Sequence, residues 1–153
     1  MATATNQPGI LIADTVAESR SALAAFAEGE GYRVQVAASA PALVEAVDRS
    51  RFDTALVDID LARSADPGGG TILNRLRVLD PELPIVVTTA YGSAELGLEA
   101  VADGARDFLQ KPWDPGRLKM ALRAQVEFGR ALRQLRRLEA ENQALRSSLN
   151  RRA

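Results

Sequence analysis

The sequence contains no cysteine and no histidine, and each absence excludes a class of functional site. Without cysteine, the chain has no disulfides and no thiolate metal centre. Without histidine, it has neither a histidine general base nor a histidine metal ligand. Any metal ion must then be held by oxygen atoms, which favours magnesium, calcium or manganese.

Long apolar runs and the layout of a signal peptide are missing as well. No apolar run approaches the ~20 residues that a membrane-spanning helix needs. Residues 1–9 are polar and lack the basic-then-apolar order of a secretory signal. We therefore expect a cytoplasmic protein with no membrane partner, and we expect residues 1–8 to be disordered.

The charges divide the chain into two segments. The 153 residues fit one globular domain with a modest appendage, and the net charge is −1. Residues 1–113 carry 9 basic and 16 acidic side chains, whereas residues 114–153 carry 10 basic and 4 acidic ones. Two segments with different roles are indicated. We expect a domain over residues 9–126 and a helical coiled-coil extension over residues 127–153.

The apolar pattern predicts five repeats of a strand followed by a helix. Short apolar runs typical of buried strands occur at residues 10–13, 32–36, 53–58, 84–89 and 105–109. Helical spacing follows each run, with Thr15 expected to cap the first helix and Ser39 the second. Residues 61–70 are expected to form a glycine-rich loop. This order is typical of a parallel sheet with helices on both faces.

Polar side chains end four of the predicted strands. Asp14, Asp58, Thr89 and Lys111 each stand at, or one residue past, the end of a different apolar run. Because the carboxyl ends of parallel strands meet at one edge of the sheet, these groups should lie close together. A carboxylate nucleophile, a hydroxyl, a cation and a second acid suit phosphoryl transfer to a carboxylate.

Four motifs at these strand ends resemble those of the response-regulator receiver domain of two-component systems. They are ILIAD at residues 10–14, ALVDID at 55–60, VTTAYG at 87–92 and DFLQKPW at 107–113. The resemblance covers residues 10 to 126. It implies a flavodoxin-like (βα)5 doubly wound sheet with strand order 2-1-3-4-5.

The resemblance also implies a role for each strand-end residue. Asp58 would accept a phosphoryl group from the phosphohistidine of a sensor histidine kinase. Thr89 and Lys111 would bind the phosphoryl oxygens, and Phe108 would be the aromatic switch that turns inward on activation. The bond between Lys111 and Pro112 stands where the family often has a cis peptide.

The implied metal site departs from the family pattern at Thr15. Receivers use Mg²⁺, and here Asp14, Asp58 and the backbone carbonyl of Asp60 would be its ligands. The family normally ends its first strand with two consecutive acids, and Thr15 stands where the second acid is expected. A neutral hydroxyl is a poor magnesium ligand beside a carboxylate, so we expect weaker Mg²⁺ binding. The Asp60 side chain is the candidate to supply the missing charge.

A heptad pattern continues through the C-terminal helix, which starts near residue 114. Its a and d positions form a seam of residues, namely Phe128, Ala131, Leu135, Leu138, Asn142, Leu145 and Leu149. The seam extends backward through Ala121 and Ala124. Asn142 at an a position favours a parallel two-stranded coil in register. We therefore expect a parallel homodimer, with a single helix fraying into solvent as the alternative.

Two other functions remain open. The first is a receiver that is not phosphorylated and acts as a dimerisation or docking module. The second is a small phosphatase, because Asp58 and Asp60 have the Asp-x-Asp spacing of haloacid-dehalogenase-type enzymes. Direct nucleic-acid binding by the basic C-terminal helix is not expected, because the helix lacks the dense basic block that precedes a zipper.

The chain also looks like the receiver segments of sigma-54-type and hydrogenase-regulator transcription activators. In those proteins a linker helix leads to an ATPase domain and a DNA-binding domain. The 153 residues include no such domains. We therefore expect a role in transcriptional regulation, either as a fragment of a longer regulator or as a stand-alone receiver.

Overall fold

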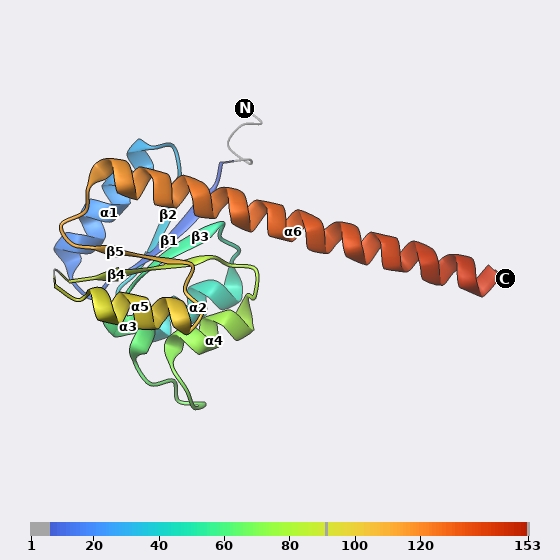
Figure 1. Ribbon diagram of the computed structural model, residues 1–153, viewed down its shortest axis with the longest axis horizontal. Coiled ribbons are helices and arrows are strands. Elements are labelled where there is room, and N and C mark those ends of the chain that lie inside the picture. The colour runs from blue at the N-terminus through green and yellow to red at the C-terminus, as the bar shows by residue number, and fades with distance from the viewer. Residues whose placement is uncertain (1–6, 91, 153) are drawn as a thin grey trace.

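Five strands form one parallel sheet in the order β2-β1-β3-β4-β5 (Figure 1). The structure is a computed structural model that describes residues 7–90 and 92–152. The strands are β1 (Gly9–Ala13), β2 (Arg33–Ala37), β3 (Thr54–Asp58), β4 (Ile85–Thr89) and β5 (Asp107–Gln110). The helices are α1 (Ala17–Gly29), α2 (Ala40–Arg49), α3 (Ile59–Arg63), α4 (Ile72–Leu79), α5 (Ala94–Ala102) and α6 (Pro115–Arg152). The predicted fold class and strand order are confirmed.

The three central strands are buried along their whole length. Every residue of β1, β3 and β4 is buried, whereas β2, at one edge, is mostly exposed. Strands covered by helices on both faces need apolar side chains in both directions, so their sequences form continuous apolar runs. This explains why the short apolar runs predicted the strands well.

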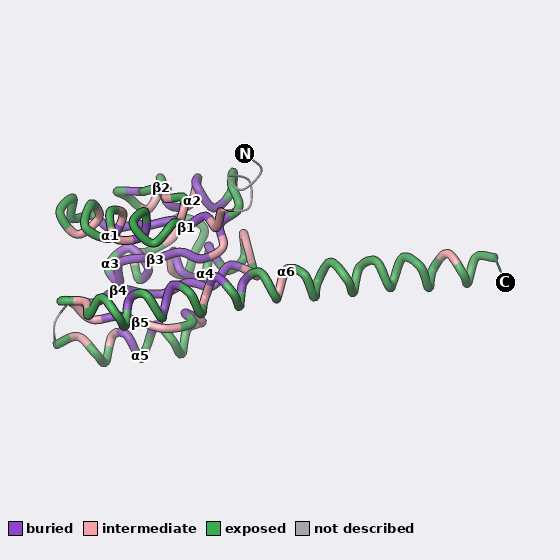
Figure 2. The backbone as a smooth tube through the Cα atoms, turned by 90° about the horizontal axis from the view of Figure 1, so that it is seen from above, coloured by how far each residue is buried: buried purple, intermediate pink, exposed green. Residues whose placement is uncertain are grey.

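Helices cover both faces of the sheet and create two cores (Figures 1 and 2). On one face, α1 and α6 pack through Leu23 and Leu122 against residues that include Ile12 of β1. On the other face, α2 and α4 pack through Leu43 and Leu76, together with α3 and α5. The sheet is therefore the middle of three layers.

The predicted N-terminal disorder falls mainly on residues 1–6, which lie outside the described residues.

The predicted cap at Thr15 is wrong. The residue that precedes α1 is Val16, whose side chain makes no capping hydrogen bond. Instead, the Val16 N–H donates to Oδ1 of Asp14 at 2.8 Å. An aspartate commonly bonds the backbone two residues further along, and this turn carries the chain past Thr15 before the helix begins. The cap at Ser39 is confirmed, since its hydroxyl accepts from the N–H of Ala42.

Residues 59–63 form the short helix α3, so the predicted loop from 61 begins too early. The carboxylate of Asp58 caps this helix by accepting from the Asp60 N–H at 3.2 Å. Ile59 and Leu61 are buried in the core that α2 and α4 cover. A capping acid and apolar side chains that reach the core are sufficient to form one turn of helix. The glycine-rich loop before α4 therefore starts at Ser64.

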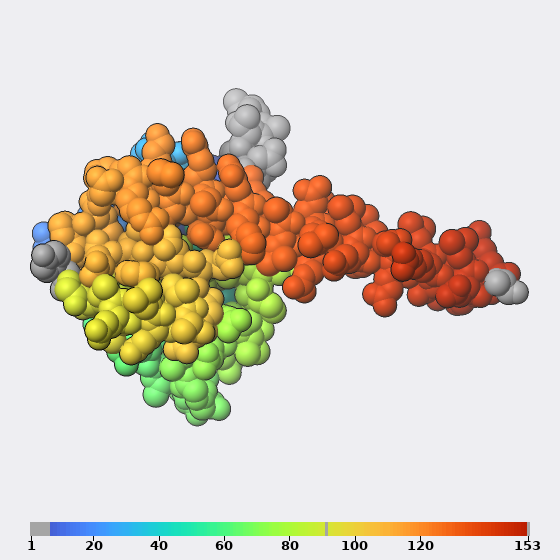
Figure 3. Space-filling view, viewed as in Figure 1, coloured from blue at the N-terminus to red at the C-terminus, as the bar shows by residue number. Residues whose placement is uncertain are grey.

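Helix α6 is one continuous helix, as the sequence predicted, but its first turns belong to the domain. Leu118, Ala121, Leu122, Val126 and Gly129 are buried against it. Ala121 is only 2% exposed, so its expected place on the seam is wrong: the sheet already covers that side chain. Beyond the domain the helix projects into solvent (Figure 3). In residues 7–90 and 92–152, no helix is both long and apolar enough to span a bilayer.

Candidate functional site

The strand-end residues meet at the carboxyl edge of the sheet. Asp14 follows β1, Asp58 ends β3, Thr89 ends β4, and Lys111 follows β5. The backbone N–H of Lys111 donates to the carbonyl of Thr89 at 2.9 Å, which joins two of these ends directly. The Lys111 ammonium lies 3.5 Å from Oδ2 of Asp14. A ligand at this edge would meet carboxylates, hydroxyls and a cation together.

Asp58 carries a carboxylate that is costly to ionise. Asp58 is only 7% exposed, and its Oδ2 accepts a hydrogen bond from the Asp60 N–H. Burial raises the pKa of Asp58 above its ordinary value of 3.8, and the nearby charge of Asp14 raises this pKa further. Lys111 opposes these effects more weakly. The carboxylate is therefore more basic than a solvated one, and it gains from any partner that neutralises its charge.

Asp14 is fully buried, and both of its carboxylate oxygens have donors. Oδ1 accepts from the Val16 N–H at 2.8 Å, and Oδ2 faces the Lys111 ammonium. The same ammonium donates to Oγ of Ser19, on the first turn of α1, at 3.0 Å. Ser19 was not among the residues that the sequence pattern indicated. Its position in the helix that follows Asp14 is the only sequence signal that could have found it.

Two buried threonine hydroxyls end β4. Thr88 is 1% exposed and Thr89 is 0% exposed, and neither Oγ1 has a hydrogen-bond partner among the described residues. Thr88 is the register partner of Asp58, although the sequence analysis selected only Thr89. A buried hydroxyl without a partner costs free energy, and such groups often mark a place that a ligand or a rearrangement completes. The edge of β4 thus offers two hydroxyls.

Phe108, on β5, lies against the backbone of α5. A Cβ atom at Gly97 would overlap the Phe108 ring, so the glycine provides the space that the ring occupies. Phe108 is partly buried and packs against the core that α2 and α4 form. Its role as an aromatic switch stays a prediction. The packing explains why a glycine stands inside this helix.

The residues present suit a magnesium ion that is held by few protein oxygens. The buried carboxylates of Asp14 and Asp58 lie close enough for the charge of one to raise the pKa of the other. Among the described residues, no group of three or more carboxylates could hold a metal ion, and Asp60 and Thr15 are both exposed. Mg²⁺ commonly keeps several waters and uses one or two carboxylates plus phosphate oxygens, so the two-carboxylate set fits it.

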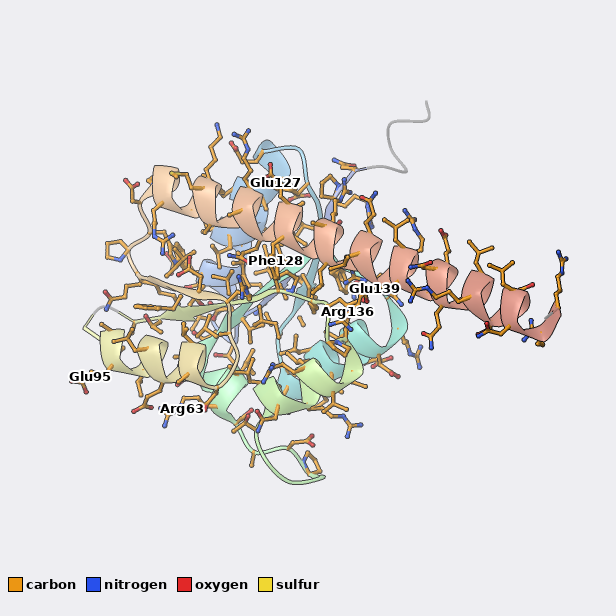
Figure 4. The ribbon with its side chains drawn as sticks, turned by 45° about the vertical axis from the view of Figure 1, so that its right-hand side comes forward. Arg63, Glu95, Glu127, Phe128, Arg136 and Glu139 are labelled. Carbon is orange, nitrogen blue, oxygen red and sulfur yellow. The ribbon has the colours of Figure 1, made fainter. Side chains whose placement is uncertain are left out.

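The predicted seam residues lie on the exposed side of α6. Phe128 is 39% exposed, and Leu135, Leu138, Leu145 and Leu149 are each at least half exposed. The Arg106 guanidinium covers the Phe128 ring at 4.1 Å from its centroid. Figure 4 labels Phe128, where α6 still runs beside the domain, and Arg136 and Glu139 further along. The leucines of the seam from Leu135 to Leu149 are therefore exposed in a single chain.

Comparisons with known proteins agree with this geometry. The family model described as the response regulator receiver domain matches residues 10–123. The transcriptional regulatory protein ZraR of Escherichia coli (strain K12) is 33% identical over 139 residues, which is 91% of this chain and 30% of that protein. The alginate biosynthesis transcriptional regulatory protein AlgB of Pseudomonas aeruginosa is 33% identical over 114 residues, 74% of this chain and 25% of that protein.

A solved structure shows the same similarity. The crystal structure of NtrX from Brucella abortus in complex with ADP is 25% identical, with a TM-score of 0.74. The match covers 86% of this chain and 30% of that chain. The chain thus spans less than a third of the length of each of these three proteins. The family model matches residues 10–123, and the strand order agrees with it. The chain therefore belongs to the family of response regulator receiver domains of two-component systems.

Proposed function

We propose that this chain is a receiver that accepts a phosphoryl group on Asp58 from the phosphohistidine of a sensor histidine kinase. The observation that carries the proposal is the set of groups around Asp58. A buried, basic carboxylate lies at the same sheet edge as a lysine ammonium and two hydroxyls that have no partner in the described part of the chain. Phosphoryl transfer needs positioning and charge neutralisation more than covalent chemistry, and this set supplies both.

In the proposed step an oxygen of Asp58 attacks phosphorus. The bond between phosphorus and the kinase imidazole nitrogen breaks, and its electron pair stays on that nitrogen. The Asp60 N–H holds Oδ2, which leaves Oδ1 as the attacking atom. Mg²⁺, held by Asp14, Asp58 and the Asp60 carbonyl, would neutralise charge on the phosphoryl oxygens. The hydroxyl of Thr89 and the ammonium of Lys111 then hydrogen-bond those oxygens.

The proposed signal passes from Lys111 to α6 through a short connection. Trp113 packs against the core beneath α6, and Asp114 caps the helix by accepting from the Arg117 N–H at 2.9 Å. A shift of Lys111 toward a phosphorylated Asp58 therefore moves the residues that start the helix. Phe108 responds to the space that Thr89 leaves, which changes the surface of α5 and β5. Phosphorylation would shift a population between two arrangements.

The decisive experiment is the intact mass of the protein after incubation with acetyl phosphate and Mg²⁺. One added phosphoryl group is expected in the wild type and in Asp66→Asn, a control on the loop before α4. None is expected in Asp58→Asn. Thr89→Val should form the adduct but lack the proposed change at Phe108 and at the surface of α5 and β5. Comparing Thr88→Val with Thr89→Val shows which of the two hydroxyls is needed for that change. A wild type without an adduct, or an adduct on Asp58→Asn, would contradict the proposal.

We also propose that α6 forms a parallel coiled coil with a second copy. The exposed leucines of the seam support this, because isolated apolar side chains along one stripe gain free energy only when a partner buries them. The side of the helix that contacts the domain is the opposite one, through residues such as Val126 and Gly129. The domain therefore leaves the seam accessible, and Asn142 favours two strands in register.

The dimer is tested by the molar mass of the full chain in solution from light scattering. The wild type should be a dimer at micromolar concentration. The double variant Leu138→Ser with Leu145→Ser should be a monomer, because it removes two d positions. The matched control, Arg137→Ser with Ala144→Ser, changes two outward c positions and should stay dimeric. A monomeric wild type rejects the coiled coil and leaves a single solvated helix.

A second candidate function is a docking module that works without phosphorylation. Thr15 at a metal position and the ammonium of Lys111 on Asp14 favour it, because both weaken cation binding at the site. A wild type that forms no adduct yet dimerises would support this candidate. We propose no phosphatase activity, because membership of the receiver family accounts for Asp58 and Asp60.

The proposed output is transcriptional. ZraR and AlgB are named as transcriptional regulatory proteins, and this chain spans less than a third of each. We infer that α6 transmits the receiver state to an ATPase or DNA-binding domain, on the same or another chain, in the cytoplasm. We do not propose direct nucleic-acid binding by α6. A reporter driven by the cognate promoter, compared between wild type and Asp58→Asn, tests this output.

A further inference from the structure

The hydrogen bonds of the Lys111 ammonium go to residues of the β1 end and α1, namely Asp14 and Ser19. Its ammonium donates to Oγ of Ser19 at 3.0 Å and lies 3.5 Å from Oδ2 of Asp14. The ring of Trp113 approaches the same nitrogen at 5.5 Å from its centroid. Lys111 is thus held by a hydroxyl, a carboxylate and an aromatic face.

Ser19 is held rigidly where it meets the ammonium. The Asp14 carboxylate fixes the start of α1 through the Val16 N–H, and the Arg20 guanidinium donates to the Asp14 carbonyl at 2.8 Å. These two bonds tie the first turn of α1 to the end of β1. Because the turn is fixed on both sides of Ser19, its hydroxyl is a preorganised acceptor for an ammonium and not a mobile surface group.

The position of Lys111 matters because it occupies the carboxylate that a metal would need. Asp14 Oδ1 already accepts a backbone N–H, so Oδ2 is the oxygen with more lone-pair capacity for a cation. Lys111 occupies that oxygen. Thr15 offers no second carboxylate at the end of β1, so a divalent ion and the ammonium compete for Asp14. Two cations that share a single carboxylate repel each other strongly at short distance in a partly buried site.

We propose that Ser19 is a positioning residue that holds the Lys111 ammonium on Asp14, so that divalent-cation binding requires Lys111 to leave Ser19. The proposal rests on the proposed function only in taking Asp14 and Asp58 as the cation ligands. In this arrangement the lysine acts as an internal counter-ion in the metal-free receiver. Cation binding then frees the ammonium to reach Asp58, which links metal loading to readiness for phosphate.

The test is a Mg²⁺ titration of the full chain, followed by calorimetry and by the fluorescence of Trp113, the only tryptophan. Ser19→Ala removes the acceptor and should tighten Mg²⁺ binding about 2- to 10-fold, the change that one net hydrogen bond corresponds to. Ser19→Thr keeps a hydroxyl and should bind Mg²⁺ as the wild type does. In the wild type, Mg²⁺ should also change the emission of Trp113, because the ammonium leaves its ring.

A double-mutant cycle separates this role from a merely structural one. Lys111→Met should bind Mg²⁺ most tightly, and adding Ser19→Ala to it should have no further effect. The proposal is overturned if Ser19→Ala binds Mg²⁺ no better than the wild type, or if its effect persists without Lys111. It is also overturned if no variant binds Mg²⁺. None of these readouts uses phosphorylation, so a receiver that fails to accept phosphate leaves the titration informative.

Discussion

At the scale of single residues, the folded structure disfavours ionisation of Asp58. Its carboxylate is buried beside the buried carboxylate of Asp14, and both effects raise its pKa. Lys111 is directed mainly at Asp14 and compensates Asp58 only weakly. An ionised Asp58 therefore destabilises the folded receiver, and a phosphoryl group with its counter-ions would find a site that already favours neutralisation.

This arrangement predicts how the stability of Asp58→Asn depends on pH. Since the folded pKa of Asp58 lies above its unfolded value, the folded state binds its proton more tightly, and stability falls as pH rises through the interval between the two values. At neutral pH, Asp58→Asn should therefore raise the free energy of unfolding, while asparagine keeps the cap of α3. The gain should vanish as pH falls below about 3.8.

Urea unfolding of both proteins between acidic and neutral pH, at one protein concentration, measures this difference. A gain that stays constant with pH would show that its cause is packing and not ionisation. A loss of stability at neutral pH would contradict the prediction outright.

At the scale of elements, α5 and β5 fit each other through one glycine. The Phe108 ring fills the space where a side chain at Gly97 would otherwise lie. A glycine in a helix interior is unfavourable by roughly 0.5–1 kcal/mol relative to alanine, so the sequence alone makes this helix look weak. The contact with Phe108 offsets this preference, because a flat ring directly against the helix backbone buries apolar surface on both elements.

We predict that Gly97→Ala destabilises the domain by about 1–3 kcal/mol despite its better helix propensity, because the ring must move. Gly29→Ala is the matched control. Apart from its chain neighbours and its own helix backbone, no atom of the described residues lies within 4 Å of the added Cβ, so the alanine should be neutral or stabilising by up to about 1 kcal/mol. Thermal unfolding of the two variants compares them. Equal effects at both positions would show that Phe108 does not constrain α5.

At the scale of the whole molecule, α6 is fastened where it leaves the domain, at the edge of the sheet opposite the candidate site. Gly129 packs against the backbone at Asp53, where a Cβ would meet the carbonyl oxygen at 2.7 Å. Four residues later, Arg133 donates to the carbonyl of Phe52 at 2.8 Å and to the Asp80 carboxylate at 2.9 Å. These contacts fix the direction in which the seam emerges, which the proposed transmission through α6 requires.

Arg133→Met should therefore destabilise the protein by about 1–3 kcal/mol, because a half-buried carboxylate and a carbonyl lose their donor. Arg137→Met, one turn further along the helix and exposed, should change stability by less than about 0.5 kcal/mol. Both are measured by urea unfolding at a fixed protein concentration, since dimerisation makes stability concentration-dependent. An effect as small for Arg133 as for Arg137 would mean that α6 is held by apolar packing alone.

The sequence by itself determined the five strands and every helix except α3, the continuous α6, and the four polar residues at the strand ends. Each of these depends on local spacing: period 2 or unbroken apolar runs for strands, period 3.6 for helices, and the alternation that makes a parallel sheet. The side on which a ligand would sit followed from the same rule, because all parallel strands end at one edge.

Only the tertiary structure decided which of these side chains touch. Ser19 and Lys111 are 92 residues apart in the chain, and Asp14 and Lys111 are 97 apart, so no local pattern links them. Contacts between distant parts of the chain also decide the pairing of Thr88 with Asp58 and the position of Ala121 in the core instead of on the seam. A local sequence pattern does not predict either of them. A heptad specifies only that a stripe is apolar, and the packing of the sheet decides which part of that stripe is already covered.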